Sequence, residues 1–198
     1  MTIVALLLAA GRGTRYDPTG RALKLLQPAR RGPHAGAPLA AAAARTLLAA
    51  LPEVVAVVRH ADDEPQRQLH TLLRGEGCTL LECARADEGM GASIACGVTG
   101  NAAADGWLVA LADMPAIEPE TVRAVAQALT DGALTAAPAF GGRRGHPVGF
   151  AAALRAPLAA LTRDDGARSV LSAHPPQLIA VDDPGVLYDV DAPEEAPQ

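Results

Sequence analysis

The chain has 198 residues, of which 49% are hydrophobic and 20% are charged, and its formal net charge at pH 7 is −5. This composition excludes an intrinsically disordered chain, and the length predicts a single domain, residues 1–198, with a substantial core. The negative charge argues against a nucleic-acid-binding protein, because such proteins usually carry a basic excess.

The cysteines and the N-terminal segment indicate the cellular compartment of the protein. Cys78, Cys83 and Cys96 are odd in number and lack C-x-x-C spacing, so we interpret them as free thiols rather than as a zinc site or a disulfide framework. The apolar run at the start has no charged leader and is too short for a signal peptide or a membrane span. We therefore expect a cytoplasmic protein with no membrane partner.

Apolar runs alternate with helix-like segments along the chain. The first run, Ile3–Leu8, predicts a fully buried strand, since a strand covered on both faces reads as a continuous apolar run. Further strands are expected at 53–58, 78–83, 107–112 and 134–139, an extended segment at 147–150, and a last strand or hairpin at 178–181 and 186–188. Helices are expected at 39–51, 62–75, from 93 onward, at 119–130, at 151–161 apart from Pro157, and at 167–173. This order predicts an α/β fold, a Rossmann-like three-layer sandwich with a mostly parallel sheet.

A small, glycine-bearing and basic loop follows the first strand. Gly11 and Gly13 let the backbone approach a ligand closely, and Arg12, Arg15 and Lys24 suit phosphate oxygens. The alternative is a basic surface loop that only ends a strand. The loop lacks the spacing of a Walker motif and of a dinucleotide fingerprint.

Asp113 closes the strand expected at 107–112, at the same sheet edge as the glycine loop. A carboxylate in this place suits Mg²⁺, which binds hard oxygen ligands together with substrate phosphates. The alternative is a helix N-cap ahead of Pro115, and Ser93 likewise allows either a nucleotide contact or an N-cap.

The loop resembles the signature of the MobA-like nucleotidyltransferases. Leu8-Ala9-Ala10-Gly11-Arg12-Gly13-Thr14-Arg15, with Lys24 downstream, is similar to L-A-A-G-x-S-x-R-M-G-x-x-K of the molybdenum-cofactor cytidylyltransferase branch. It differs from that pattern in Gly13, in Tyr16 and in the longer stretch 17–22 before Lys24.

Four more segments resemble this family in the same order, so that the likeness covers nearly the whole chain. They are Gly89-Met90-Gly91-Ala92-Ser93-Ile94, Asp113-Met114-Pro115, Gly145-His146-Pro147-Val148-Gly149-Phe150 and Tyr188-Asp189-Val190-Asp191-Ala192-Pro193-Glu194. The loop Asp164-Asp165-Gly166-Ala167-Arg168 is also similar to a family loop.

The resemblance implies roles for particular residues. It implies Lys24, Arg15 and Asp113 as catalytic residues, and Asp113 and Asp191 as ligands of Mg²⁺. It implies His146 and Arg168 as acceptor-binding residues. The implied nucleotide-binding residues are Leu8, Ala9, Ala10, Gly11, Arg12, Gly13, Lys24, Gly91 and Ser93.

The implied reaction is transfer of a nucleoside monophosphate from an NTP to the phosphate of a molybdopterin-type acceptor, with release of pyrophosphate. Ala10 favours CTP, because the GTP-using branch usually has glycine there, and a molybdoenzyme that receives the product is a further implied partner. The alternatives are a guanylyltransferase, a sugar- or alditol-phosphate nucleotidyltransferase, an NAD(P)-binding oxidoreductase and a non-catalytic carrier of the molybdenum cofactor.

Overall fold

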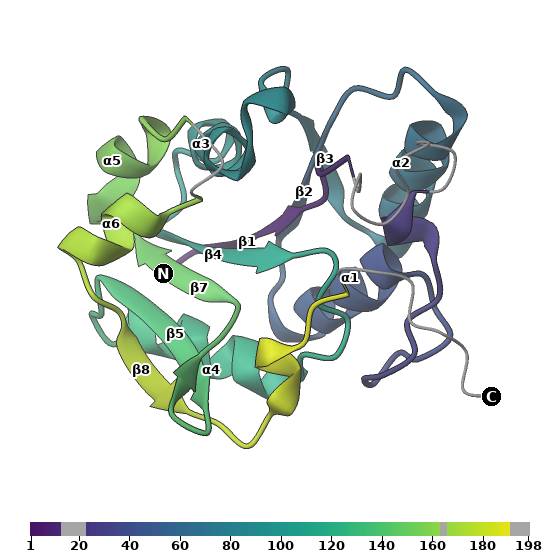
Figure 1. Ribbon diagram of the computed structural model, residues 1–198. Helices are drawn as coiled ribbons and strands as arrows, with labels where there is room; N and C mark the ends of the chain where they lie inside the picture. The colour runs from purple at the N-terminus through teal and green to yellow at the C-terminus, as the bar shows by residue number, and fades with distance from the viewer. Residues whose placement is uncertain (13–22, 163–165, 191–198) are drawn as a thin grey trace.

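The computed structural model describes residues 1–12, 23–162 and 166–190. Within these ranges the strands form one eight-stranded sheet in the order β3-β2-β1-β4-β7-β5-β6, with β8 paired to β5 (Figure 1). The strands are β1 Ile3–Leu8, β2 Val54–Val58, β3 Thr79–Glu82, β4 Gly106–Leu111, β5 Thr135–Phe140, β6 Arg143–Arg144, β7 Val148–Ala151 and β8 Gln177–Ala180. The pairs β1–β2, β2–β3, β1–β4 and β5–β8 are parallel, whereas β7 runs antiparallel to β4 and β5, and β6 antiparallel to β5. The predicted mostly parallel α/β sheet is confirmed.

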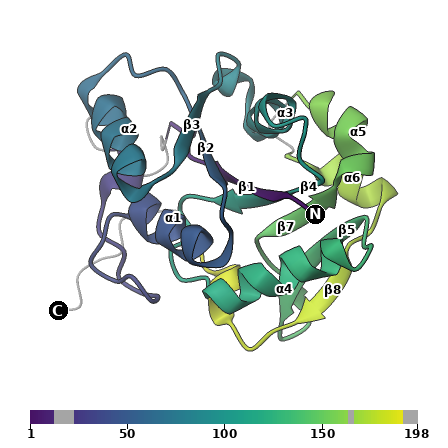
Figure 2. The same ribbon diagram turned by 180° about the vertical axis from the view of Figure 1, so that it is seen from behind.

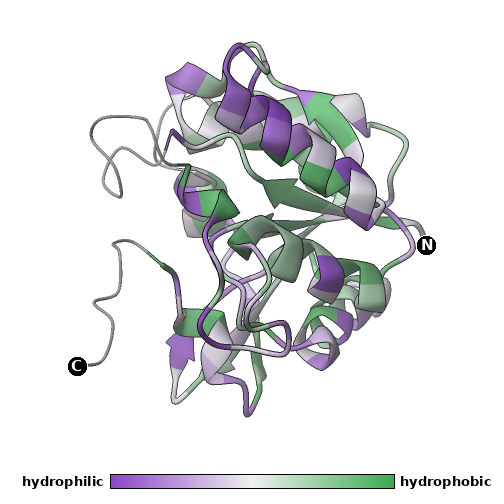
Figure 3. Cartoon of the chain, turned by 90° about the vertical axis from the view of Figure 1, so that its right-hand side faces the viewer, coloured by the Kyte–Doolittle hydropathy of each residue, from purple (hydrophilic) through white to green (hydrophobic). Residues whose placement is uncertain are grey.

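Helices cover both faces of this sheet (Figures 1 and 2). They are α1 Leu39–Ala50, α2 Glu64–Glu76, α3 Met90–Gly100, α4 Pro119–Thr130, α5 Arg155–Ala159 and α6 Arg168–Ala173. Side chains alternate across β1: Ile3, Ala5 and Leu7 pack with α1, α2 and α4. Val4 and Leu6 pack with α3, α5 and α6. Figure 3 shows the resulting layers, with hydrophobic strands lying between helices that carry hydrophilic residues.

The start of α3 differs from the sequence prediction. The helix begins at Met90 instead of Ser93, and Gly89, with φ of 117°, is its N-cap residue. The low helix propensity of glycine favoured a turn, but Gly91 and Ala92 are buried residues of the helix. Ser93 is therefore inside the first turn, where its hydroxyl donates to the Gly89 carbonyl oxygen at 3.5 Å, and the N-cap interpretation of Ser93 is wrong.

The C-terminal part contains two further differences. The segment predicted as a strand at 186–188 lies largely in a short 3-10 helix, Pro184–Leu187, which Asp183 caps by accepting from the Gly185 N–H. The helix predicted at 151–161 is a 3-10 turn, Ala152–Leu154, followed by α5. Pro157 fits inside the first turn of α5, where the helix has no partner for an N–H group.

The sheet brings three chain segments to one edge. Leu8 is in register with Val57 of β2 and with Leu111 of β4. The chain stays paired just beyond the strands, because the Ala9 N–H donates to the Val57 carbonyl and the Ala112 N–H donates to the Leu8 carbonyl. The glycine loop, Arg59 and Asp113 consequently leave the sheet at the same carboxyl edge, with β1 between the other two strands.

Candidate active site

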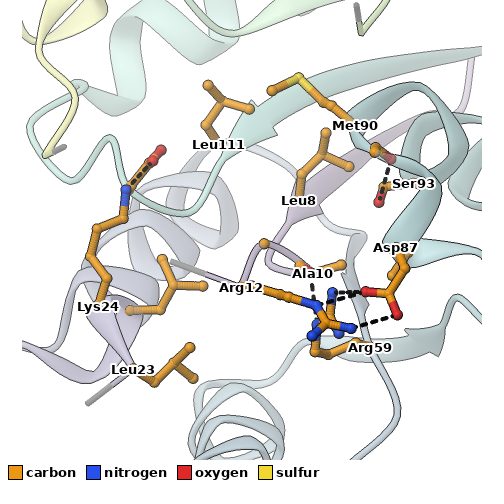
Figure 4. A pocket seen from close by; sticks show the side chains of 15 residues that line it. Leu8, Ala10, Arg12, Leu23, Lys24, Arg59, Asp87, Met90, Ser93 and Leu111 are labelled. Atoms are coloured by element: carbon orange, nitrogen blue, oxygen red, sulfur yellow. Dashed lines mark hydrogen bonds and ion pairs between the residues drawn. The ribbon is translucent and has the colours of Figure 1, made fainter. Parts of the chain in front are cut away.

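A cavity of about 300 Å³ lies at this carboxyl edge (Figure 4). Its lining residues are Leu8, Ala10, Gly11, Arg12, Leu23, Lys24, Leu25, Arg59, Ala86, Asp87, Gly89, Met90, Ser93, Leu111 and Asp113. Seven residues that the sequence placed in the site are among them, and they come from β1, the segment after it, α3 and β4. The fold therefore brings the glycine loop, the segment 89–93 and Asp113 to one cavity.

Lys24 and Asp113 form an ion pair on one side of the cavity. The Lys24 Nζ lies 2.7 Å from the Asp113 Oδ2, and the two side chains are only 12% and 24% exposed. No helix begins at Asp113, since the next one, α4, starts at Pro119 with Glu118 as its N-cap, so the N-cap interpretation of Asp113 is wrong. The carboxylate instead faces the cavity beside a cation that suits phosphate.

Asp113 fits one ligand position of a magnesium site. Among the described residues no group of three or more histidine, cysteine or acidic side chains gathers where a metal could be held. Mg²⁺ nevertheless binds commonly through one or two carboxylates, with water and substrate phosphates completing its shell. The donor set is thus compatible with a metal that arrives together with a nucleotide.

A second charged group lies on the other side of the cavity (Figure 4). Asp87 accepts from Arg12 Nε and Nη2 at 2.9 and 2.7 Å and from Arg59 Nη2 at 2.8 Å. Hydrogen bonds from Arg12 and Arg59 hold the pKa of Asp87 well below its usual value, and Asp87 in turn raises the pKa of Arg12. The group combines two cations with one carboxylate, so this side of the cavity keeps an excess positive charge.

Sequence reasoning missed Arg59 and Asp87 as site residues. Arg59 follows the strand expected at 53–58, and no motif at that place assigns it a role. In the structure its side chain is 16% exposed and donates from Nε to the Ala10 carbonyl oxygen at 3.0 Å. Its position after the strand next to β1 was the available signal, because neighbouring parallel strands end at the same edge. Asp87 lies in the short 3-10 helix Ala86–Glu88, which had no recognisable pattern.

Met90 connects the cavity with the loop before α6. It lines the cavity, and a Cβ placed on Gly166 would lie 3.1 Å from its sulfur atom. Gly166 has φ of 59°, a left-handed conformation that glycine adopts without steric cost. Arg168 follows as the exposed first residue of α6, outside the cavity lining.

His146 is near the cavity without lining it. It lies two residues before β7, whose Val148 is in register with Val109 of β4, and its backbone N–H donates to the Val186 carbonyl at 3.1 Å. Its Nδ1 is buried and has no hydrogen-bond partner. Burial lowers the pKa of this imidazole, against the opposing effect of the Val109 backbone, so the side chain is neutral near pH 7.

Other predicted residues lie behind the lining or outside the described ranges. Ala9 and Gly91 are buried and do not line the cavity. Gly13, Arg15 and Asp191 lie outside the residues that the structure describes. The residue before Asp191 is nevertheless tied to the site, because the Val190 N–H donates to the Asp113 carbonyl at 3.1 Å.

The three cysteines are free thiols, as predicted. Burial raises the pKa of Cys78 to about 11 and that of Cys96 to about 12. Both are therefore protonated near pH 7, which makes them poor nucleophiles.

Comparison with known families decides the class of this site. The sequence matches the MobA-like NTP transferase domain over residues 5–178. The chain belongs to this family. Its members transfer nucleotidyl groups, so the protein is a transferase of this type. Among curated proteins no significant match is found.

No described helix is long and apolar enough to cross a membrane.

Solved structures share the fold. Rv0371c from Mycobacterium tuberculosis has a TM-score of 0.78 and 23% identity over 97% of this chain and 94% of that chain. A nucleotidyl transferase from Methanothermobacter thermautotrophicus, Mth528, has a TM-score of 0.77 and 23% identity over 96% of this chain and 92% of that chain. A manganese complex of Rv0371c has a TM-score of 0.68 and 20% identity over 91% and 89% of the two chains.

Proposed function

We propose that the protein transfers CMP from CTP to the phosphate of a molybdopterin-type acceptor in a Mg²⁺-dependent reaction that releases pyrophosphate. The observation that carries this proposal is the pair formed by Lys24 and Asp113, 2.7 Å apart in the wall of the cavity at the carboxyl edge. A cation for phosphate oxygens and a carboxylate for a metal are the two groups that nucleotidyl transfer requires side by side.

In the proposed reaction an acceptor phosphate oxygen attacks the α-phosphorus of CTP. The new P–O bond forms as the bond to pyrophosphate breaks, and the leaving pyrophosphate keeps the electron pair. The acceptor phosphate is already ionised near pH 7, so no general base is needed. Lys24 and the backbone around Gly11 neutralise charge on the phosphates, and a Mg²⁺ ion held by Asp113 would supply further neutralisation.

Further residues complete the proposed site. Arg15 assists the triphosphate, and Asp191 is the second metal ligand, a role supported by the hydrogen bond from Val190 to the backbone of Asp113. His146 and Arg168 serve the acceptor. This is supported by the pairing of β7, which follows His146, with β4, and by the close approach of Gly166 to Met90 of the cavity. The manganese complex of the relative Rv0371c supports a divalent metal in this fold.

CTP is proposed on the evidence of Ala10. Its carbonyl accepts from Arg59, and its side chain is 4% exposed at the cavity wall. A cytoplasmic location is proposed on the free, protonated thiols, because the cytoplasm keeps cysteines reduced. A molybdoenzyme that receives the product is the further proposed partner.

Pyrophosphate release with Mg²⁺ and molybdopterin as acceptor tests the proposal, with CTP, GTP, ATP and UTP supplied in turn. We expect release with CTP. Release with GTP alone would make the protein a guanylyltransferase. Pyrophosphate release only when a sugar or alditol phosphate replaces molybdopterin would make the protein a nucleotidyltransferase for that class of acceptor. Nucleotide binding without release would support the carrier, and a nicotinamide or flavin absorbance in the purified protein would support the oxidoreductase.

A further inference from the structure

The two charged groups of the cavity lie on opposite sides of β1. Asp113 and Lys24 are on the side of β4, whereas Arg59 follows β2, and the sheet order is β2-β1-β4. Apolar side chains of Leu8, Leu111 and Met90 lie in the lining between them (Figure 4). If the phosphates of a nucleotide occupy the side with Lys24, its base reaches the side with Arg59 and Asp87.

Arg59 is held in place before any ligand arrives. Its Nε donates to the Ala10 carbonyl oxygen at 3.0 Å, and its own carbonyl oxygen contacts the Nε2 of His70 at 2.9 Å. His70 is 4% exposed, so this contact is inside the fold. A guanidinium that is fixed by its backbone, by Ala10 and by Asp87 loses little conformational freedom when it binds a ligand.

Arg59 and Asp87 can each form further hydrogen bonds. Among the described contacts, Arg59 uses its Nε hydrogen and one hydrogen of Nη2, so its other N–H groups can donate further. Among the described residues the Asp87 Oδ2 accepts from Arg12 alone, so this oxygen has a lone pair for a second donor. A donor and an acceptor are therefore available side by side at the cavity wall.

We propose that Arg59 and Asp87 recognise the base of the nucleotide: Asp87 accepts from the exocyclic amino group of cytosine, and Arg59 donates to the adjacent ring nitrogen and carbonyl oxygen. This inference rests on the proposed function, because it requires a nucleotide in the cavity. Uracil presents a carbonyl oxygen where cytosine has the amino group, and its ring nitrogen carries a hydrogen. The oxygen would face a carboxylate and the N–H would face a cation, so the pair selects against uracil from both sides.

Direct binding measurements test this pair without any acceptor. The dissociation constants of CTP, UTP, CMP and UMP are measured by calorimetry in Mg²⁺ for the wild type, Asp87→Asn and Arg59→Lys. We expect the wild type to prefer the cytidine nucleotides by at least about tenfold. Asp87→Asn removes the charge and replaces one of the two acceptor oxygens with an NH2 donor, so the preference falls by about tenfold, the loss that one hydrogen bond to a charged group produces. Arg59→Lys keeps the charge and lowers the same preference, because lysine lacks the planar fork.

The control is Glu88→Gln, which removes the same charge one residue away. Glu88 pairs with Arg85 at 2.7 Å and does not line the cavity. The Glu88→Gln variant should therefore keep the cytidine preference of the wild type. An unchanged cytidine preference in Asp87→Asn would overturn the inference and leave the proposed function standing. An equal loss of affinity for all four nucleotides in Asp87→Asn, or a loss of affinity for the triphosphates alone, would also overturn the inference. Failure of the wild type to bind any nucleotide would contradict the inference and the proposed function together.

Discussion

At the scale of single residues, the site depends on a contact between groups that lie far apart in sequence. Lys24 and Asp113 are separated by 89 positions, yet their charged atoms are 2.7 Å apart. Each residue was predicted from its own motif, but the ion pair between them was not. The sequence at the end of a strand does not show which distant side chain will lie next to it. The pair keeps two partly buried charges neutralised in the structure.

Asp113→Asn tests the metal role at this scale. The amide keeps the shape but loses the charge, so we expect kcat/KM to fall by at least about 100-fold. Removing the partner of Lys24 should lower the free energy of unfolding by about 1–3 kcal/mol, which leaves the protein folded. Steady-state pyrophosphate assays, urea unfolding and Mn²⁺ binding followed by electron paramagnetic resonance check the three effects.

Asp131→Asn is the matched control for this variant. Asp131 is exposed at the end of α4 and accepts from the Gln127 side chain, away from the cavity. Its activity and Mn²⁺ affinity should equal those of the wild type. Unaltered Mn²⁺ affinity in Asp113→Asn would remove Asp113 from the metal site, whatever the activity of the variant.

At the scale of elements, the loop before α6 is fitted to the start of α3. Gly166 has a left-handed φ of 59°, and a Cβ at this position would lie 3.1 Å from the Met90 sulfur, so Met90 would have to shift. The sequence showed both glycine motifs, but it did not show that they touch. Local signals specify the conformation of a turn, whereas the contact between two turns is set by how α3 and α6 pack on the same face of the sheet.

Gly166→Ala tests this contact. The backbone strain should cost about 1–2 kcal/mol of unfolding free energy. The Cβ at 3.1 Å from the Met90 sulfur adds a second effect, displacement of Met90 in the cavity wall, which should raise the KM for the nucleotide. Gly141→Ala is the control, since Gly141 has φ of 57° and open space around its Cβ position. Equal stability and equal KM in the two variants would show that the Met90 contact has no consequence.

A second test at this scale concerns the ends of β2 and β3. A hydrogen bond from the His60 ring to Glu82, together with the charge of Asp62, raises the pKa of His60, and His60 lowers the pKa of Glu82. Stability from the raised histidine pKa is present below the unfolded value of 6.5 and is lost as the pH rises through the folded value. Stability from the lowered glutamate pKa is present above 4.5 and is lost as the pH falls.

His60→Gln should therefore destabilise the protein most between these two values. Urea unfolding at pH 5.5 is expected to show a lower free energy of unfolding for His60→Gln than for the wild type. At pH 8.5 the difference should vanish, because both proteins then lack the imidazolium charge. A difference that is as large at pH 8.5 would mean that packing of the ring, and not its charge, stabilises these strand ends.

At the scale of the whole molecule, the parallel half was predicted better than the rest. Strands β1, β2 and β4 are buried runs, β3 is an edge strand, and helices lie between the four in sequence; the prediction placed all four within one or two residues. Beyond α4 the chain uses short segments such as the two-residue β6 and the 3-10 helix Pro184–Leu187. Their conformations depend on contacts with distant residues, for example the hydrogen bonds from the Glu118 N–H and the Thr121 hydroxyl to Asp183, so local sequence could not specify them.

The prediction of a single domain can be tested through the ligand. The cavity is lined by residues of β1, α3 and β4 and by Arg59, which follows β2, so a nucleotide would bind only when these elements are folded together. CTP with Mg²⁺ at about 100 times its dissociation constant should stabilise the protein by about 2.7 kcal/mol. For a chain of this length that corresponds to a rise in Tm of about 5–11 °C.

Scanning calorimetry with and without CTP and Mg²⁺ measures this shift. Because β5 and β8 join the same sheet as β1 to β4, we expect one transition that moves as a unit. Two transitions, of which only one moves with CTP, would divide the chain into separate folding units. Asp113→Asn should keep the single transition and lose most of the shift, since its nucleotide binds without the metal contact. If CTP and Mg²⁺ raise the Tm of Asp113→Asn as much as that of the wild type, Asp113 does not contribute to nucleotide affinity.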